Sequence, residues 1–148
     1  QEARLLIVNR NEQAMIRERM AALGIQSGQV ELVTAEHREM PDLIRRMSAG
    51  MALIKPVYSK IPSAPTKLAE YLGCGVPCLG NSGVGDMEQI LEGRGVGVAL
   101  RGFSDDEMRE AGKRLVTISG NAGIADRCRT TAEELFSLHR GVAAYAPA

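Results

Sequence analysis

Hydrophobic residues along this chain alternate between short, mainly apolar runs and amphipathic segments with a helical period. The apolar runs predict strands at Leu5–Val8, Val30–Val33, Met51–Ile54, Pro77–Leu79 and Val96–Leu100. The periodic segments predict helices near Glu12–Leu23, Pro41–Met47, Pro65–Leu72 and Asp86–Leu91, and from Ser104 to the end with breaks near Gly120–Gly123 and at Gly141. Such runs beside helices are typical of a parallel sheet covered on both faces. We therefore predict an α/β fold with a parallel sheet of about five strands, helices on both faces and a helical C-terminus.

The overall composition argues against several classes of function. The chain has 18 Lys or Arg and 18 Asp or Glu, so no basic excess indicates a nucleic-acid partner. With three Tyr, two Phe and no Trp, it offers few platforms for stacking bases. No apolar run is long enough to span a membrane. The three cysteines lack the spacing of a zinc site, so we expect free thiols, no metal and a cytoplasmic location.

A polar stripe begins the helix expected from Pro65. Parallel sheets bind ligands at the carboxyl ends of their strands, and this helix follows the loop that leaves the third strand. Pro65 suits a first helical turn, whose unpaired N–H groups suit a phosphate. Thr66 adds a hydroxyl and Lys67 a cation, and Glu70 lies one turn further on the same face. A phosphate site beside a carboxylate that binds a diol would fit a nucleotide. The alternative is an ordinary i,i+3 surface ion pair between Lys67 and Glu70.

A second turn, Asn81-Ser82-Gly83-Val84-Gly85-Asp86, follows the fourth predicted strand. Gly83 and Gly85 would let the backbone approach a ligand, and Asp86 would cap the next helix. The turn lacks the third glycine of a dinucleotide fingerprint and does not follow the first strand. Taken alone, it is interpreted as a plain turn.

Three blocks in order resemble the C-terminal, donor-binding domain of retaining GT-B glycosyltransferases of the family 4 (group 1) type. They are Pro65-Thr66-Lys67-Leu68-Ala69-Glu70-Tyr71-Leu72, Gly75-Val76-Pro77-Cys78 and Gly83-Val84-Gly85-Asp86. The similarity runs from Leu5 to about Tyr145. It implies that residues 1–148 form a Rossmann-like domain that binds a nucleotide-diphosphate sugar. The parent enzyme would transfer that sugar to an acceptor in polysaccharide or glycoconjugate biosynthesis.

The resemblance also implies roles for individual residues. Glu70 would accept hydrogen bonds from the ribose hydroxyls, with Lys67 beside it. The turn Ser63-Ala64-Pro65-Thr66 would hold the diphosphate through backbone amides, and Val33-Thr34-Ala35 would lie near the base. No metal or other cofactor is expected, because a helix N-terminus and basic side chains would neutralise the leaving diphosphate.

This chain departs from the family's pattern in two respects. Pro62 stands where the family commonly has a Glu that contacts the donor sugar, so Ser63, Thr66 or backbone N–H groups would have to replace it. The N-terminal acceptor domain is also missing, with the first strand of the donor domain. We therefore expect an enzyme fragment that does not turn over alone, and we assign no catalytic residue. A membrane would be involved only through peripheral docking of the parent enzyme at the inner face.

The missing first strand leads to an expectation for the sheet. In the family it lies between the strands that correspond to Leu5–Val8 and Met51–Ile54. We expect the strands to close into a five-stranded sheet of order 2-1-3-4-5, in which those two pair directly. In the alternative, a segment of another chain fills the gap and pairs with both exposed edges.

Two non-enzymatic alternatives remain. Lys55-Pro56 is similar to the Lys-Pro pair of response-regulator receivers. However, Asn9-Arg10-Asn11-Glu12 stands where receivers have acidic residues, and Lys55 stands where they have a phospho-accepting Asp. The second alternative is an interaction module that has kept a degenerate nucleotide site. Binding of a nucleotide-sugar would separate this module from a competent donor domain.

Overall fold

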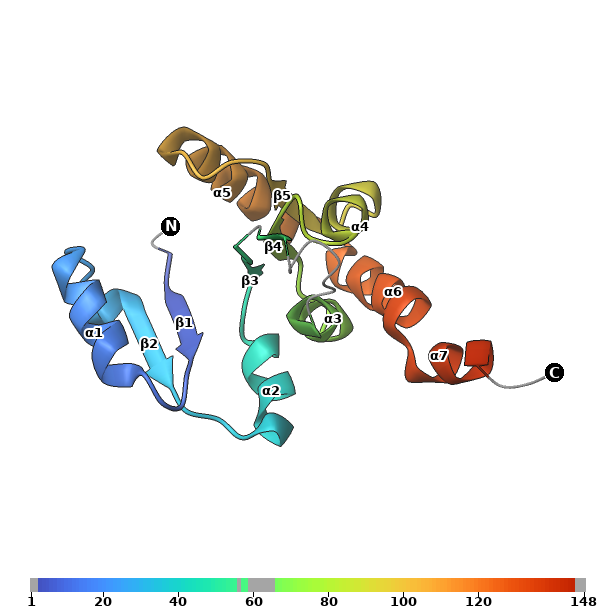
Figure 1. The fold of residues 1–148 in the computed structure, drawn as a ribbon, viewed down its shortest axis with the longest axis horizontal. Coiled ribbons are helices and arrows are strands. Elements are labelled where there is room, and N and C mark those ends of the chain that lie inside the picture. Colours follow the sequence, from blue (N-terminus) through green and yellow to red (C-terminus); the bar gives the residue numbers. More distant parts are fainter. Residues whose placement is uncertain (1–2, 56, 59–65, 146–148) are drawn as a thin grey trace. The chain divides into compact units, whose positions relative to one another are not determined.

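The chain divides into two compact units, Gln1–Leu43 and Ile44–Ala148, in a computed structural model that describes residues 3–55, 57–58 and 66–145. Figure 1 shows the helices and strands of both units. The loop residues 56 and 59–65, on which several sequence predictions fall, lie outside the described residues.

The N-terminal unit is a small β-α-β arrangement. Strands β1 (Leu5–Val8) and β2 (Val30–Val33) pair in parallel, and α1 (Gln13–Ala22) connects them. Short 3₁₀ turns at Ser27–Gln29 and His37–Glu39 precede and follow β2, and α2 (Met40–Arg45) crosses the boundary to the next unit. No described residue of this unit is fully buried. Its two strands and one helix therefore enclose no core of their own, in line with the marginal stability of two-stranded sheets.

The C-terminal unit is built on a three-stranded parallel sheet. Its strands β3 (Gly50–Ala52), β4 (Cys78–Asn81) and β5 (Gly97–Leu100) lie in the order β3-β4-β5. In register, Met51 of β3 lies beside Leu79 of β4, which lies beside Val98 of β5.

Helices cover both faces of this sheet (Figure 1). They are α3 (Thr66–Gly73), α4 (Met87–Gly93), α5 (Asp105–Ser119) and α6 (Ile124–Phe136). The last helix, α7 (Leu138–Tyr145), packs against α6. Side chains of α3, α4 and α6 share a core with Ala52 and Cys78, whereas α5 packs on the opposite face against Leu79 and Val98. These features confirm the predicted α/β class, the helices on both faces and the helical C-terminus.

The prediction of one five-stranded sheet of order 2-1-3-4-5 is wrong. The described strands form a two-stranded sheet, β1-β2, and a three-stranded sheet, β3-β4-β5, and the expected pairing of β1 with β3 is absent from both. Strand pairing depends on contacts between residues far apart in sequence, which a local pattern of apolar residues does not encode. The same pattern located all five strands, with each end within two residues of the observed bound.

The break predicted at Gly141 is also wrong. The Gly141 N–H donates to the Ser137 carbonyl oxygen (3.0 Å), so α7 continues through the glycine. The interruption lies at Ser137, whose extended backbone (φ −63°, ψ 125°) separates α6 from α7. Glycine lowers helix propensity but does not by itself end a helix.

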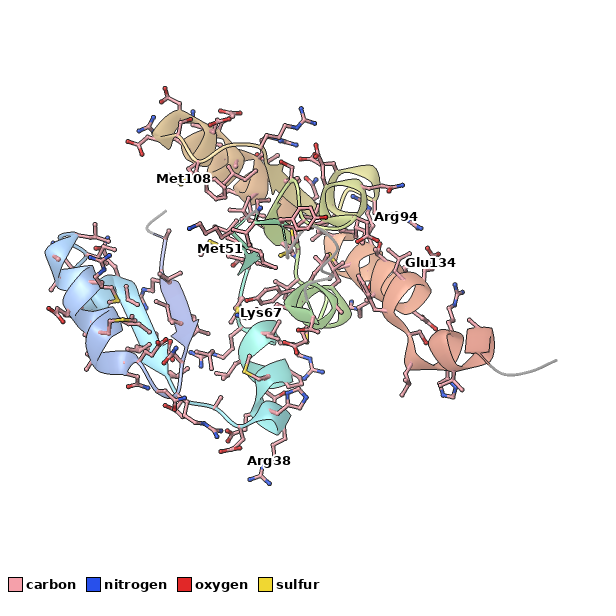
Figure 2. All side chains as sticks on the ribbon, in the orientation of Figure 1. Arg38, Met51, Lys67, Arg94, Met108 and Glu134 are labelled. Carbon is pink, nitrogen blue, oxygen red and sulfur yellow. The ribbon has the colours of Figure 1, made fainter. Side chains whose placement is uncertain are left out.

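Three polar contacts at the C-terminal end of α4 connect it to the rest of the C-terminal unit. Arg94, just after the helix, donates to Glu134 of α6 (2.6 Å; Figure 2). Glu92, in its last turn, accepts from the Ala99 N–H of β5 (3.0 Å) and from Arg114 of α5 (2.6 Å). β5 is an edge strand, so the Glu92 carboxylate satisfies a backbone donor that no neighbouring strand reaches.

The charge of Glu92 is stabilised by these contacts. Partial burial raises the pKa of its carboxyl. The hydrogen bonds from Ala99 and Arg114, together with the charges of Arg114 and Arg101, lower that pKa by a larger amount. The net pKa lies below the ordinary value for glutamate. The carboxylate therefore stabilises the folded state above the pKa of the unfolded chain, and this contribution is lost as pH falls through the lower, folded-state pKa.

Gly50 permits the close approach of α3 to the first strand of this sheet. A Cβ atom built on Gly50 would lie 2.5 Å from the Tyr71 Cγ, well inside contact distance. The Tyr71 ring therefore occupies the space that a larger residue would need.

We predict that Glu92→Gln lowers the free energy of unfolding by about 1 kcal/mol at neutral pH, because the charge-assisted hydrogen bonds are weakened. The difference from the unsubstituted protein should shrink as the pH falls through the lowered, folded-state pKa of Glu92, where Glu92 itself becomes protonated. Urea unfolding from neutral pH into acid measures this. Glu110→Gln, on the exposed face of α5, is the control, and a pH-independent effect of Glu92→Gln would contradict the prediction.

We predict that Gly50→Ala destabilises the protein by about 1–3 kcal/mol, since the new methyl group overlaps the Tyr71 ring. Gly73→Ala is the matched control, because a Cβ there meets no atom within 4 Å. Adding Tyr71→Ala to Gly50→Ala should cost less than the two single effects combined, because the overlap is removed. Strict additivity in thermal or urea unfolding would rule out this packing explanation.

Candidate functional site

Helix α3 is held in one rotational setting on the sheet. Leu68 and Leu72 are 1% and 0% exposed and lie in the core of the C-terminal unit. The Tyr71 hydroxyl also approaches the Met51 carbonyl oxygen (3.5 Å), and its ring packs on Gly50. These contacts determine which face of α3 points outward.

The outward face of α3 carries the predicted polar stripe. Thr66 and Lys67 are exposed, and Glu70 is partly buried. Within the described part of the chain, neither the Lys67 ammonium nor the Glu70 carboxylate takes part in a hydrogen bond or an ion pair; in particular, they are not paired with each other. The ordinary i,i+3 ion pair is therefore not formed. A cation and a hydrogen-bond acceptor are both available to a ligand at the carboxyl edge of the sheet.

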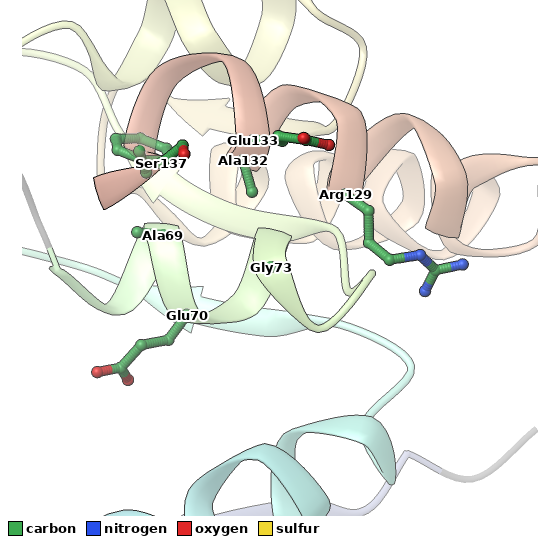
Figure 3. Close-up of a pocket in the computed structure, with 8 residues that line it drawn as sticks. Ala69, Glu70, Gly73, Arg129, Ala132, Glu133 and Ser137 are labelled. Carbon is green, nitrogen blue, oxygen red and sulfur yellow. The ribbon is translucent and has the colours of Figure 1, made fainter. Parts of the chain in front are cut away.

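A hollow of about 520 Å³ lies on another side of α3, between that helix and α6. It is lined by Ala69, Glu70, Gly73, Arg129, Ala132, Glu133, Phe136 and Ser137. Figure 3 shows the Glu70 side chain directed away from α6. The hollow therefore does not receive the Glu70 carboxylate, and we place the candidate site on the outward face of α3 instead.

The glycine-rich turn after β4 has the backbone conformation that its sequence indicates. Gly83 (φ 79°) and Gly85 (φ 50°) are both left-handed, which strongly favours glycine. Between them the Val84 side chain is fully buried in the core and anchors the turn. Asp86 occupies the capping position of α4, but its side chain makes no capping hydrogen bond, so that part of the expectation is wrong.

Sequence reasoning missed the role of Asn81 at this end of the sheet. Its side chain is 1% exposed, accepts a hydrogen bond from the Ile54 N–H (2.8 Å) and donates to the Ser82 carbonyl oxygen (3.0 Å). Asn81 therefore connects the chain leaving β3 with the turn leaving β4. The available signal was a polar residue at the end of an otherwise apolar strand.

The other predicted site residues lie outside the described residues or in the N-terminal unit. Ser63, Ala64 and Pro65 lie outside the described residues. Val33, Thr34 and Ala35 belong to the N-terminal unit. There the Thr34 hydroxyl accepts from Gln13 (2.8 Å), and the Ala35 carbonyl oxygen accepts from Arg10 (3.4 Å).

The two buried thiols, Cys78 and Cys128, are poorly suited to nucleophilic chemistry. No disulfide joins any of the three cysteines, and burial raises the pKa of Cys78 to about 12 and that of Cys128 to about 11. Both therefore remain protonated at neutral pH. Among the described residues, no group of three or more His, Cys, Asp or Glu is placed to hold a metal ion.

Comparisons with known proteins show a likeness in fold. No protein-family model matches the chain, and no curated protein does. A solved structure does match: the crystal structure of AviGT4, a glycosyltransferase involved in avilamycin A biosynthesis, with a TM-score of 0.68 and 23% sequence identity. The match covers 96% of this chain and 42% of AviGT4, so the chain spans less than half the length of that enzyme. This chain therefore shares its fold with part of a glycosyltransferase.

Proposed function

We propose that this chain is the nucleotide-sugar-binding part of a glycosyltransferase. The observation that carries the proposal is the Glu70 carboxylate, which points outward one turn into α3 with Lys67 beside it and lacks a partner among the described residues. The fold shared with part of AviGT4 supports the assignment. By its sequence motifs, the parent enzyme would be a retaining GT-B transferase of the family 4 type, acting in polysaccharide or glycoconjugate assembly.

The proposed chemistry follows from the charges of the site. Glu70 would accept hydrogen bonds from the two ribose hydroxyls, because a carboxylate offers acceptors only. Lys67 and the first N–H groups of α3 would attract the diphosphate. As the sugar leaves, negative charge grows on that diphosphate, and preorganised positive charge would lower the barrier. No metal is required by this scheme.

Catalysis would require a part of the enzyme that binds the acceptor, which we propose to be a separate N-terminal domain. On this proposal the 148-residue chain binds the donor but does not transfer the sugar. The base contact expected at Val33–Ala35 stays a prediction, since these residues belong to the other unit. In the described part of the chain, no helix is both long and apolar enough to cross a membrane. A cytoplasmic location remains part of the proposal.

We predict that Glu70→Gln weakens binding of UDP or GDP by about tenfold or more, because a hydrogen bond to a charged acceptor contributes about 1.5–3 kcal/mol. Isothermal titration calorimetry on both forms measures the change. Glu110→Gln on α5 is the matched control, since it removes the same charge far along the chain from the site. Equal affinities for the unsubstituted and Glu70→Gln proteins would exclude Glu70 from the site.

We also predict that nucleoside diphosphate binding is independent of divalent cations. Mg²⁺ requires near-octahedral oxygen coordination, and a single carboxylate beside a lysine is a poor ligand set for it. The test compares calorimetric titrations in the presence of EDTA and of added Mg²⁺. Loss of binding in EDTA would show that the diphosphate is held through a metal rather than by Lys67 and α3.

A further inference from the structure

The backbone hydrogen bonds between β3 and β4 end one donor earlier than the alternating pattern of a parallel pair would allow. The Gly50 N–H donates to the Pro77 carbonyl oxygen (2.9 Å). In a parallel pair, donors facing the same neighbour recur at every second residue. Ala52 would therefore donate to Leu79, and Ile54 to the backbone carbonyl of Asn81. The strand nevertheless ends at Ala52, although the apolar run continues to Ile54.

The Asn81 side chain takes the place of that next acceptor. The Ile54 N–H donates to the Asn81 Oδ1 (2.8 Å) rather than to the main-chain oxygen of the same residue. The Asn81 Nδ2 then donates to the Ser82 carbonyl oxygen (3.0 Å), which satisfies the other end of the amide. A side-chain amide thus lies between two strands that would otherwise stay paired, and it separates them at their carboxyl ends.

This separation falls beside the candidate site. Ile54 packs against the core that contains Leu68 and Leu72 of α3. The same helix carries Lys67 and Glu70, and the chain after Asn81 enters the turn of Gly83 and Gly85. Asn81 is 1% exposed, so its amide cannot reorient toward water without losing both hydrogen bonds. One buried side chain therefore fixes the position of Ile54 relative to the start of the glycine-rich turn.

We propose that Asn81 is a positioning residue for nucleoside diphosphate binding. It fixes Ile54, which packs against the same core as α3, relative to the glycine-rich turn, so that Lys67 and Glu70 of α3 keep the position that the ligand needs. The proposal rests on the proposed function for its ligand, but not for the geometry that it assigns to Asn81.

The experiment compares UDP and GDP binding by the full chain with two substitutions of Asn81. Asn81→Ala removes both hydrogen bonds and is expected to weaken binding by about tenfold, since small displacements of binding groups are costly. Asn81→Asp keeps an acceptor for the Ile54 N–H, but at neutral pH it places a carboxylate oxygen against the Ser82 carbonyl. The introduced carboxyl is buried, which raises its pKa. On lowering the pH from about 7 to about 5 it gains a proton that it can donate to Ser82. Binding by Asn81→Asp, relative to the unsubstituted protein at each pH, should therefore recover as the pH falls.

The matched control is Thr131→Ala in α6. Thr131 is the other buried polar side chain among the described residues, 3% exposed, and it lies in a helix that forms no part of the site. It controls for loss of stability alone and is expected to leave nucleotide affinity unchanged. Unaltered binding by Asn81→Ala, or an Asn81→Asp protein with no pH-dependent recovery, would overturn the positioning role and leave the proposed function intact.

A second measurement decides the question without a nucleotide. Amide hydrogen exchange, followed by NMR, should show a protected Ile54 N–H in the unsubstituted protein. Asn81→Ala should remove that protection and shift the Lys67 and Glu70 amide resonances, whereas Thr131→Ala should do neither. If the unsubstituted chain binds neither nucleotide, the proposed function fails for this chain. Unchanged Ile54 exchange in Asn81→Ala would then overturn the positioning role separately.

Discussion

The burial of Leu68 and Leu72 in the core of the C-terminal unit is the constraint on which the candidate site depends. Two leucines four residues apart occupy one side of α3, so their burial leaves a single rotational setting for the helix. Tyr71 strengthens that setting by resting on Gly50, the only residue type small enough to accept its ring there. The outward direction of Lys67 and Glu70 is a geometric result of these contacts, and it requires no interaction of the two polar side chains themselves.

The elements of the fold could be predicted because each depends on a local pattern. The runs Leu5–Val8 and Val30–Val33 coincide with β1 and β2, since a short run of mainly apolar, β-favouring residues between polar segments is typical of a strand. The face of α3 followed from its 3.6-residue period in the same way. The positive φ angles of Gly83 and Gly85 could also be predicted, because two glycines so spaced in a short polar turn have few other conformations.

What could not be predicted depends on contacts between distant residues. The pairing of strands into two sheets is one case, since no residue of β1 or β3 specifies its neighbour by type alone. The end of β3 at Ala52 is another case. There the Ile54 N–H donates to the side chain of Asn81, which lies 27 residues later in the sequence. The outward direction of the Glu70 carboxylate could be predicted from its helix. The hydrogen bonds of the buried Asn81 amide with Ile54 and Ser82 could not.

The contact between Glu92 and Ala99 has a consequence for how this sheet meets other molecules. An edge strand with free N–H groups can template a strand from another chain, which is a common origin of aggregation. On β5 the Ala99 donor already has a carboxylate acceptor, and Arg114 places a charged group beside it. A foreign strand would have to displace this ion pair before it could form a continuous ladder. The Glu92 carboxylate, which connects α4 to the sheet, thus also opposes self-association along the edge of β5. This protection weakens in acid, when the Glu92 carboxylate is protonated.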